Sequence, residues 1–285
     1  MRLRYAYNTN GAANHRLKDA IALIAEAGYD GVALTLDHHH LDPFAPDYEH
    51  QAEALARDLG RRGLGSVIET GARYLLDPRQ KHEPTLVSPK PEGRAHRVAF
   101  LGRALRVAEI LGSEAVSFWA GVPQADVTPA QARSWLVEGI SALAEIAAAR
   151  GVTLALEPEP GMAIETVDDY TALSALLDEA APRLALDTGH CLVTGERDPA
   201  AAVHEFADRL GTVSIEDMRR GVHLHLPFGE GDMDMPAVLG ALRSTGFQRL
   251  ACVELSRESP RAHQAIPEAL DWLRRCEAGL GEAAA

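Results

Sequence analysis

Cysteine, long apolar runs and a leader-like segment are scarce or missing in this chain. The 3 cysteines, Cys191, Cys252 and Cys276, are too few and too widely spaced for a disulfide framework or a Cys-x-x-Cys metal knuckle. No apolar run approaches the ~18 residues of a membrane-spanning helix. The first 15 residues lack the apolar stretch of a signal peptide. We therefore expect a protein of the reducing cytoplasm with no membrane partner.

Positive charge is also in short supply. Lys and Arg number 28 against 41 Asp and Glu, which gives a formal net charge of −13. This balance argues against a nucleic-acid partner, because such a surface needs clustered Lys and Arg, and against docking on anionic lipid. With 46% hydrophobic and 24% charged residues over 285 positions, the chain can bury a full core, which excludes global disorder.

Short apolar runs alternate eight times with longer amphipathic runs. The short runs are nearly continuous in apolar residues, which is typical of parallel strands covered on both faces. The predicted strands are Arg4–Tyr7, Gly31–Leu36, Gly65–Glu69, Ala115–Trp119, Thr153–Glu157, Arg183–Asp187, Thr212–Glu216 and Leu250–Leu255. The predicted helices are His15–Ala27, Tyr48–Arg62, Arg94–Leu111, Pro129–Arg150, Val167–Ala180, Pro199–Leu210, Met235–Ser244 and Arg261–Glu277.

Helix boundaries in this pattern agree with known capping signals. Thr128, Thr166 and Asp198 stand where helices begin, and each is a preferred N-cap residue. Glycines stand where helices end, at Gly28, Gly63, Gly112, Gly151, Gly211 and Gly246. No linker divides the chain, so we predict one α/β domain over residues 1–285, a single (β/α)8 TIM barrel. The alternative is a doubly wound sheet, which would normally have a glycine-rich turn after its first strand.

Acidic side chains stand at or near the ends of several predicted strands, and three of them lie at matching depth. Glu157, Asp187 and Glu254 each follow an apolar run, and His190 lies three residues after Asp187. Active sites of such barrels lie at the carboxyl ends of the strands. Carboxylates gathered there repel one another unless a cation lies among them or their pKa values are raised. The mixed oxygen and nitrogen donors suit Mn, Co, Zn, Fe or Mg. Any one acid could instead cap the next helix, and Asp217 could only tie down its loop.

Four segments together resemble the xylose isomerase-like TIM barrel superfamily, which includes sugar phosphate isomerases and epimerases and the family 2 apurinic (AP) endonucleases. Each segment alone is a weak signal, but their order along the chain is specific. They are LALEPEPG at Leu154–Gly161, LALDTGH at Leu184–His190, SIEDMRRGVHLHLPFGEGDMD at Ser214–Asp234 and CVELS at Cys252–Ser256.

The resemblance implies a divalent metal held by Glu157, Asp187 and Glu254. The fourth ligand of the family is usually a His on strand seven, and this chain has Ser214 there. A serine hydroxyl is a poor ligand, so the site would bind more weakly, recruit water or use another imidazole. The endonuclease branch has a second cluster, which corresponds here to His190, His223 and His225. The alternative is that His223 and His225 are loop residues that only form hydrogen bonds.

The resemblance also implies a mechanism. Glu157 and Glu254 would act as base and acid on a proton next to a carbonyl, through an enediolate, while His190 and Arg220 orient the substrate oxygens. This predicts a metal-dependent isomerase or epimerase acting on a sugar or sugar phosphate-like substrate. A dehydratase or lyase on a hydroxylated acid, an AP endonuclease-like phosphodiesterase and a metal-poor accessory protein remain alternatives.

Further candidate substrate contacts lie in the loops at the same end of the barrel. The long loop after strand three contains Arg73 and Lys81, which suggests an anionic or polyhydroxylated substrate. Trp119 ends strand four and could stack on a sugar ring or pack in the core. The run His38–His40 is either a polar loop or places one imidazole at the mouth. We expect a small carbohydrate-like partner, and a homo-oligomer is left open.

Overall fold

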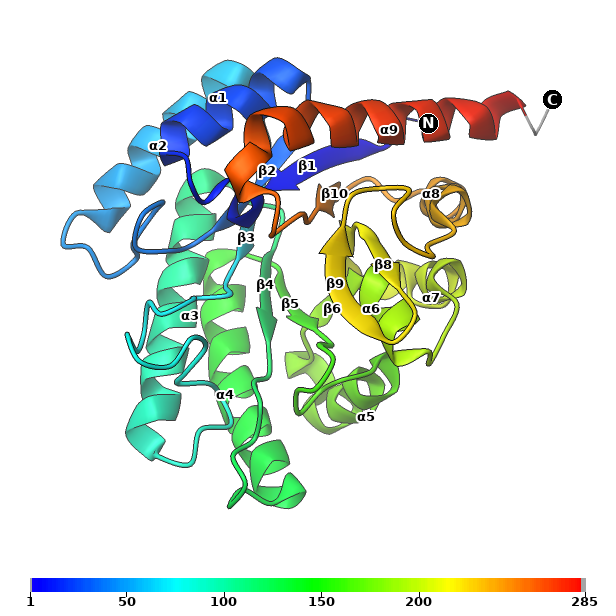
Figure 1. Cartoon of the computed structure of the whole chain (residues 1–285). Helices are drawn as coiled ribbons and strands as arrows, with labels where there is room; N and C mark the ends of the chain where they lie inside the picture. The colour runs from blue at the N-terminus through cyan, green and yellow to red at the C-terminus, as the bar shows by residue number, and fades with distance from the viewer. Residues whose placement is uncertain (1, 283–285) are drawn as a thin grey trace.

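Eight parallel strands close into a barrel in the computed structural model, which describes residues 2–282 (Figure 1). Around the barrel the strands pair in the order β1-β10-β7-β6-β5-β4-β3-β2. This is the arrangement of a (β/α)8 TIM barrel, so the predicted fold is confirmed. The single domain over 1–285 stays a prediction, since residues 1 and 283–285 lie outside the described residues. The barrel strands are β1 Arg4–Asn8, β2 Gly31–Thr35, β3 Gly65–Glu69, β4 Val116–Trp119, β5 Leu154–Glu157, β6 Arg183–Asp187, β7 Leu210–Ile215 and β10 Leu250–Val253.

Helices surround the barrel and bury their apolar faces against it (Figure 1). Thr128 and Thr166 form the predicted N-caps, each accepting a hydrogen bond from the backbone N–H three residues on, and Asp198 does the same. The helices are α1 Leu17–Ala27, α2 Tyr48–Arg62, α3 Pro91–Leu111, α4 Pro129–Arg150, α5 Val167–Leu177, α6 Thr188–Thr194, α7 Pro199–Glu205, α8 Met235–Ser244 and α9 Ala262–Glu282. Single turns of 3-10 helix are η1 Thr9–Ala12, η2 Asp178–Ala180, η3 Ala207–Arg209 and η4 Ser259–Arg261.

Gly211 corrects one predicted boundary. The sequence pattern suggested that it ends a helix, but α7 already stops at Glu205 and Gly211 lies inside β7. A Cβ atom at this position would lie 2.9 Å from the Cβ of Ala155 and 3.0 Å from the Cβ of Arg183. Glycine is therefore required here because neighbouring strands approach closely, and not because a helix needs a left-handed cap.

Gly211→Ala is expected to destabilise the fold by about 1–3 kcal/mol, because the added methyl group meets Cβ atoms that cannot move without the backbone. Gly60→Ala is the matched control. Gly60 lies in α2, and within the described part of the chain no atom would lie within 4 Å of its added Cβ. Alanine there should stabilise by about 0.5–1 kcal/mol. Urea unfolding of both variants measures the difference, and equal stability would contradict the packing argument.

A β-hairpin between β7 and α8 was not predicted. It consists of β8, Asp217–Arg219, and β9, Val222–Leu226, which pair antiparallel and lie against α6 (Figure 1). Asp217 fastens the segment that follows, accepting hydrogen bonds from the N–H groups of Gly229 at 2.8 Å and Met233 at 3.1 Å. The structural alternative for Asp217, that it ties down the loop, is thus confirmed. Short helix α6, directly after Asp187, was also missed.

The segment between β3 and α3 folds back over the carboxyl ends of the barrel strands, the end at which the β8–β9 hairpin also lies. Arg97 of α3 is fully buried beneath it and donates from Nη2 to the carbonyl oxygen of Thr70 at 2.9 Å. His82 Nδ1 lies 3.2 Å from the carbonyl oxygen of Gly71.

The three cysteines are free, in line with the expectation of no disulfide framework. Within residues 2–282, no helix combines the length and apolar character needed to span a membrane.

Candidate active site

A cavity of about 340 Å³ opens at the carboxyl ends of the barrel strands. Strands β3, β4, β5 and β10 and the segments after them contribute most of its polar walls. Its acids are Glu69, Glu157, Glu159 and Glu254, and its imidazoles are His82, His190, His223 and His225. Arg73, Lys81, Arg257, Asn10 and Trp119 line it as well. The sequence-predicted residues Glu157, Glu254, His190, His223, His225, Arg73, Lys81 and Trp119 therefore meet in one place.

Strand register determines which side chains of β6 and β7 point inward. Asp187 and Cys252 both pair with Ser214 across the sheet. Thr212 Oγ1 lies 3.7 Å from Cys252 Sγ inside the barrel. Because alternate residues of a strand share a face, Thr212, Ser214 and Glu216 form one inward column. The column places a hydroxyl next to Asp187 and a carboxyl group just beyond it.

Buried acids form the floor of the site. Asp187 is the N-cap of α6, and its Oδ1 accepts a hydrogen bond from the His190 N–H at 3.0 Å. Within the described residues its Oδ2 has no hydrogen-bond partner. Glu157 ends β5, where burial, followed by the nearby Glu159 and Glu254, raises its pKa well above the ordinary value. Glu157, Asp187 and His190 each offer one donor atom, all within 4.8 Å of one another.

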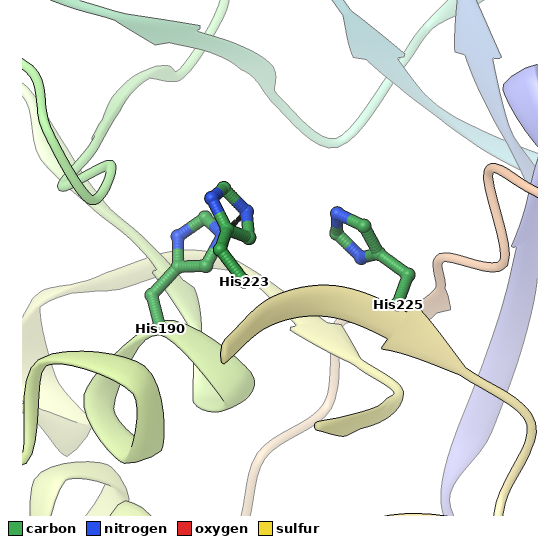
Figure 2. Close-up of side chains that lie close together, drawn as sticks. All are labelled: His190, His223 and His225. Carbon is green, nitrogen blue, oxygen red and sulfur yellow. Dashed lines mark hydrogen bonds between the residues drawn. The ribbon is translucent and has the colours of Figure 1, made fainter. Parts of the chain in front are cut away.

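Three imidazoles stand beside these acids. Figure 2 shows His190 extending from α6, and His223 and His225 extending from β9. His190 Nδ1 lies 3.0 Å from the carbonyl oxygen of Pro158, which fixes the proton on Nδ1 and leaves Nε2 to face His223 Nε2 at 3.1 Å. Glu159 lies 3.7 Å from both of these Nε2 atoms. His223 and His225 thus lie on β9 in one cluster with His190, and their role as metal ligands stays a prediction.

The pKa directions follow from burial and charge in this cluster. Burial alone would lower the pKa of His190, but Asp187 and Glu159 raise it above the ordinary value. Burial and the neighbouring His190 lower the pKa of His223 to about 4. Burial raises the pKa of Glu159 to about 7. The site thus contains groups of the same type with different proton affinities, as acid–base chemistry requires.

Glu254 directly follows β10, which flanks β7 on one side, whereas β6, which ends in Asp187, flanks it on the other. Its Oε1 accepts a hydrogen bond from Asn10 Nδ2 at 2.8 Å. Asn10 belongs to η1, directly after β1. Among the described residues, the groups whose donor atoms fall within 4.8 Å do not include Glu254, although it lines the same cavity.

Trp119 combines the two alternatives that its sequence position left open. Its side chain lines the cavity, yet the residue is 6% exposed. The Arg97 guanidinium lies 4.2 Å from its ring centroid, and the His82 ring meets it edge-on at 5.4 Å. Burial lowers the pKa of Arg97 to about 9. Sequence reasoning missed Arg97, since a helical arginine gives no sign that it is buried.

Other predicted or neglected residues have plain positions. Arg220 is exposed at the hairpin turn and is not among the described residues that line the cavity. Among residues 2–282, His38 to His40 do not line the cavity either, which agrees with a polar loop. His38 Nδ1 lies 2.6 Å from Asp37 Oδ1. Sequence reasoning also missed the cavity residues Asn10 and Arg257.

A closed parallel barrel with a buried acid and imidazole cluster at its carboxyl-end mouth defines a TIM barrel of enzyme type. The chain matches the xylose isomerase-like TIM barrel family over residues 21–276, and it belongs to this family. It is similar to the 2-oxo-tetronate isomerase of Cupriavidus necator, with 25% identity over 86% of this chain and 89% of the relative.

Two further comparisons agree with this assignment. The L-ribulose-5-phosphate 3-epimerase UlaE of Shigella flexneri is 23% identical over 78% of this chain and 79% of its own length. The crystal structure of the IOLI protein with a bound zinc atom superimposes with a TM-score of 0.74 at 18% identity, covering 98% of this chain and 99% of that one. At this identity the superposition speaks for the fold.

Proposed function

We propose that this protein is a divalent-metal-dependent isomerase or epimerase acting on a small polyhydroxylated carbonyl compound. The observation that supports it best is the grouping of Glu157, Asp187 and His190 within 4.8 Å, at the mouth that Glu254 also lines. The named relatives, an isomerase of a 2-oxo sugar acid and an epimerase of a ketose phosphate, act on compounds of this class.

The residues present fit a divalent cation. Asp187 has a 0% exposed side chain, and its Oδ2 accepts no hydrogen bond from residues 2–282 and lies 3.6 Å from His190 Nε2. A carboxylate buried in this way is costly unless a cation or a proton balances its charge. Glu157, Asp187, Glu254 and His190 would hold the ion, and this donor set suits Mn, Zn, Co, Mg or Fe. The ion would stabilise negative charge on the substrate oxygens during proton removal. The zinc bound by the structurally similar IOLI protein supports the same view.

Proton transfer would fall to the two strand-end glutamates. The Asn10 hydrogen bond holds Glu254 as an acceptor at one wall, and Glu157 stands across the cavity at the end of β5. One carboxylate would remove the proton next to the carbonyl group, and the other would return a proton to the neighbouring carbon or the opposite face. Because the Pro158 carbonyl oxygen holds the Nδ1 proton of His190, Nε2 is the nitrogen of this residue that would bind the ion.

A cationic wall favours an acidic group on the substrate. Arg73, Lys81 and Arg257 line the cavity of a protein whose net charge is −13. Lys81 and Arg257 are exposed, so each can reach a ligand without the cost of leaving water completely. A carboxylate or phosphate at this wall would also keep the reacting carbons turned toward the glutamates.

Arg257→Met is expected to raise the KM for an acidic substrate by about tenfold or more, with kcat little changed, because one charge-assisted hydrogen bond is lost at ~1.5–3 kcal/mol. The turnover of a neutral sugar should be unaffected. Arg79→Met removes the same charge from an exposed residue and serves as the control. Equal KM values for acidic and neutral substrates in all three proteins would contradict an acidic substrate.

The proposed activity is tested by product analysis. Purified protein is incubated with a panel of ketoses, ketose phosphates and 2-oxo sugar acids, and the products are separated by chromatography that resolves epimers. We expect one substrate to reach an equilibrium mixture with its isomer or epimer, without net gain or loss of water. Conversion to a dehydrated product would instead support the lyase alternative, and no conversion of any compound would contradict the proposal.

A further inference from the structure

Glu216 is a buried carboxyl group that the proposed chemistry does not use. It follows directly after β7 and is 0% exposed. Its carboxylate oxygens accept no hydrogen bond from an N–H or hydroxyl donor of the described residues, and its side chain lies within hydrogen-bond reach of the Asp187 carboxyl group, with which it could share a proton. It stands next to Asp187, whose Oδ2 likewise accepts no hydrogen bond inside residues 2–282 and lies 3.6 Å from His190 Nε2. Two adjacent buried carboxyl groups need a positive charge or a shared proton between them, because neither can be solvated by water.

His225 is the third member of this arrangement. Its Nδ1 is buried and, among the residues described, has no hydrogen-bond partner. Asp187, Glu216 and His225 each provide one donor atom, and these atoms all lie within 4.8 Å of one another. A shared proton would satisfy the two carboxyl groups alone and would leave the imidazole nitrogen unexplained. A cation satisfies all three, and two oxygens with one nitrogen form a common ligand set for Zn²⁺ and similar ions.

Gly189 gives Glu216 the room to reach this point. A Cβ atom on Gly189 would lie 2.2 Å from Glu216 Oε1, so any other residue would displace the carboxyl group. Met218, on the other side, would also meet that Cβ, its Cγ and Sδ both at 2.8 Å. The pocket around Glu216 is therefore shaped for a carboxyl group on one side and is apolar on the other, and it offers Glu216 no donor within the described chain.

Ser214 explains why such an arrangement is needed. It precedes Glu216 by two residues in the inward column of β7 and pairs with Asp187, so it stands beside the carboxylate that both ligand groups share. A neutral hydroxyl contributes little to binding a divalent ion. Glu216 and His225 lie close enough to Asp187 to supply what Ser214 does not.

We propose that Asp187, Glu216 and His225 bind a divalent cation in this chain, with Glu216 and His225 standing in for a strand-seven ligand at position 214. The proposal rests on the metal dependence in the proposed function, and it adds Glu216 and His225 to the ligands named there for the same ion, with Asp187 common to both groups. Asp187 belongs both to this group and to the group with Glu157 and His190, so it joins the buried cation position to the cavity.

The test is metal binding to the purified protein after chelator treatment, followed by titration with Co²⁺ and Zn²⁺ in a calorimeter. Visible absorption of bound Co²⁺ reports the number and geometry of its ligands. Glu216→Gln should weaken binding by about 10–100-fold or more, since even the loss of an outer-shell partner costs that much. Glu230→Gln makes the same chemical change at an exposed residue of the following loop and should bind like the wild type.

Restoration by a new ligand makes the test specific. In Glu216→Gln, the second change Ser214→His should recover most of the lost affinity and change the Co²⁺ spectrum, because imidazole is a strong ligand at a position adjacent to Asp187. Wild-type affinity and spectrum in Glu216→Gln would overturn the proposal. So would lost affinity in Glu216→Gln that Ser214→His does not restore, because the ion would then not lie between the two positions.

Thermal unfolding separates binding from folding. Without metal, Glu216→Gln should unfold at the wild-type temperature or above it, because the amide removes a buried carboxyl group that has no donor in residues 2–282. With metal, only the wild type should gain stability, as a ligand of the native state requires. A variant that unfolds earlier without metal would show a folding role and overturn the proposal. Metal bound through Glu216 in a protein without isomerase activity would contradict only the proposed function.

Discussion

Glu254→Gln is expected to reduce exchange of the substrate proton next to the carbonyl by about 10²–10⁴-fold, the contribution of a positioned general base. The amide can keep the hydrogen bond from Asn10 Nδ2, which lies 2.8 Å from Glu254 Oε1, so the side chain should stay in place. It cannot accept a proton. The measurement is the rate of deuterium uptake by the substrate in deuterated water, followed by NMR.

A control isolates the effect of the carboxylate. Glu92→Gln makes the same replacement at an exposed residue in the first turn of α3 and should exchange at the wild-type rate. If Glu254→Gln exchanges as fast as Glu92→Gln, then Glu254 is not the base. If it exchanges slowly but binds substrate with unchanged affinity, the residue acts in the transition state, as we expect.

Removal of the divalent ion is the second change with a large expected effect. The ion supplies several kcal/mol of charge stabilisation, and at 1.36 kcal/mol per tenfold this predicts a loss of about 10²–10⁴-fold in kcat. Dialysis against a chelator, with metal content measured before and after, gives the comparison. Adding back Mn²⁺, Co²⁺ or Zn²⁺ should restore both the bound ion and turnover. Full activity in protein that contains less than stoichiometric metal would contradict metal dependence.

The barrel and its acidic mouth could be predicted because both depend on short-range pattern. Apolar runs ending in an acid, as in Leu184–Asp187, already show where a buried strand meets the active-site end. The β8–β9 hairpin could not be predicted in the same way. Its second strand, VHLHL at Val222–Leu226, alternates apolar and polar residues, but its partner is only 3 residues long, too short to show an alternating pattern of its own.

Side-chain burial explains what the sequence left out of the site. Glu216 is an acid after an apolar strand like Glu157, but only the tertiary packing of Gly189 against it reveals that it is fully buried. The resemblance implied that Arg220 orients substrate oxygens, yet the tight hairpin turn at Gly221, with φ of 69°, leaves Arg220 exposed. Its substrate role therefore stays a prediction that the geometry does not favour.

The central claim is that the strand-end glutamates move a proton next to a carbonyl group while a divalent ion is bound. The most direct measurement is deuterium incorporation into ketoses, ketose phosphates and 2-oxo sugar acids by metal-loaded protein in deuterated water. We predict incorporation at the carbon next to the carbonyl in one compound class, lost on chelation and regained with metal. No incorporation into any compound, together with efficient and salt-dependent cleavage of a DNA duplex containing an abasic site, would contradict the account.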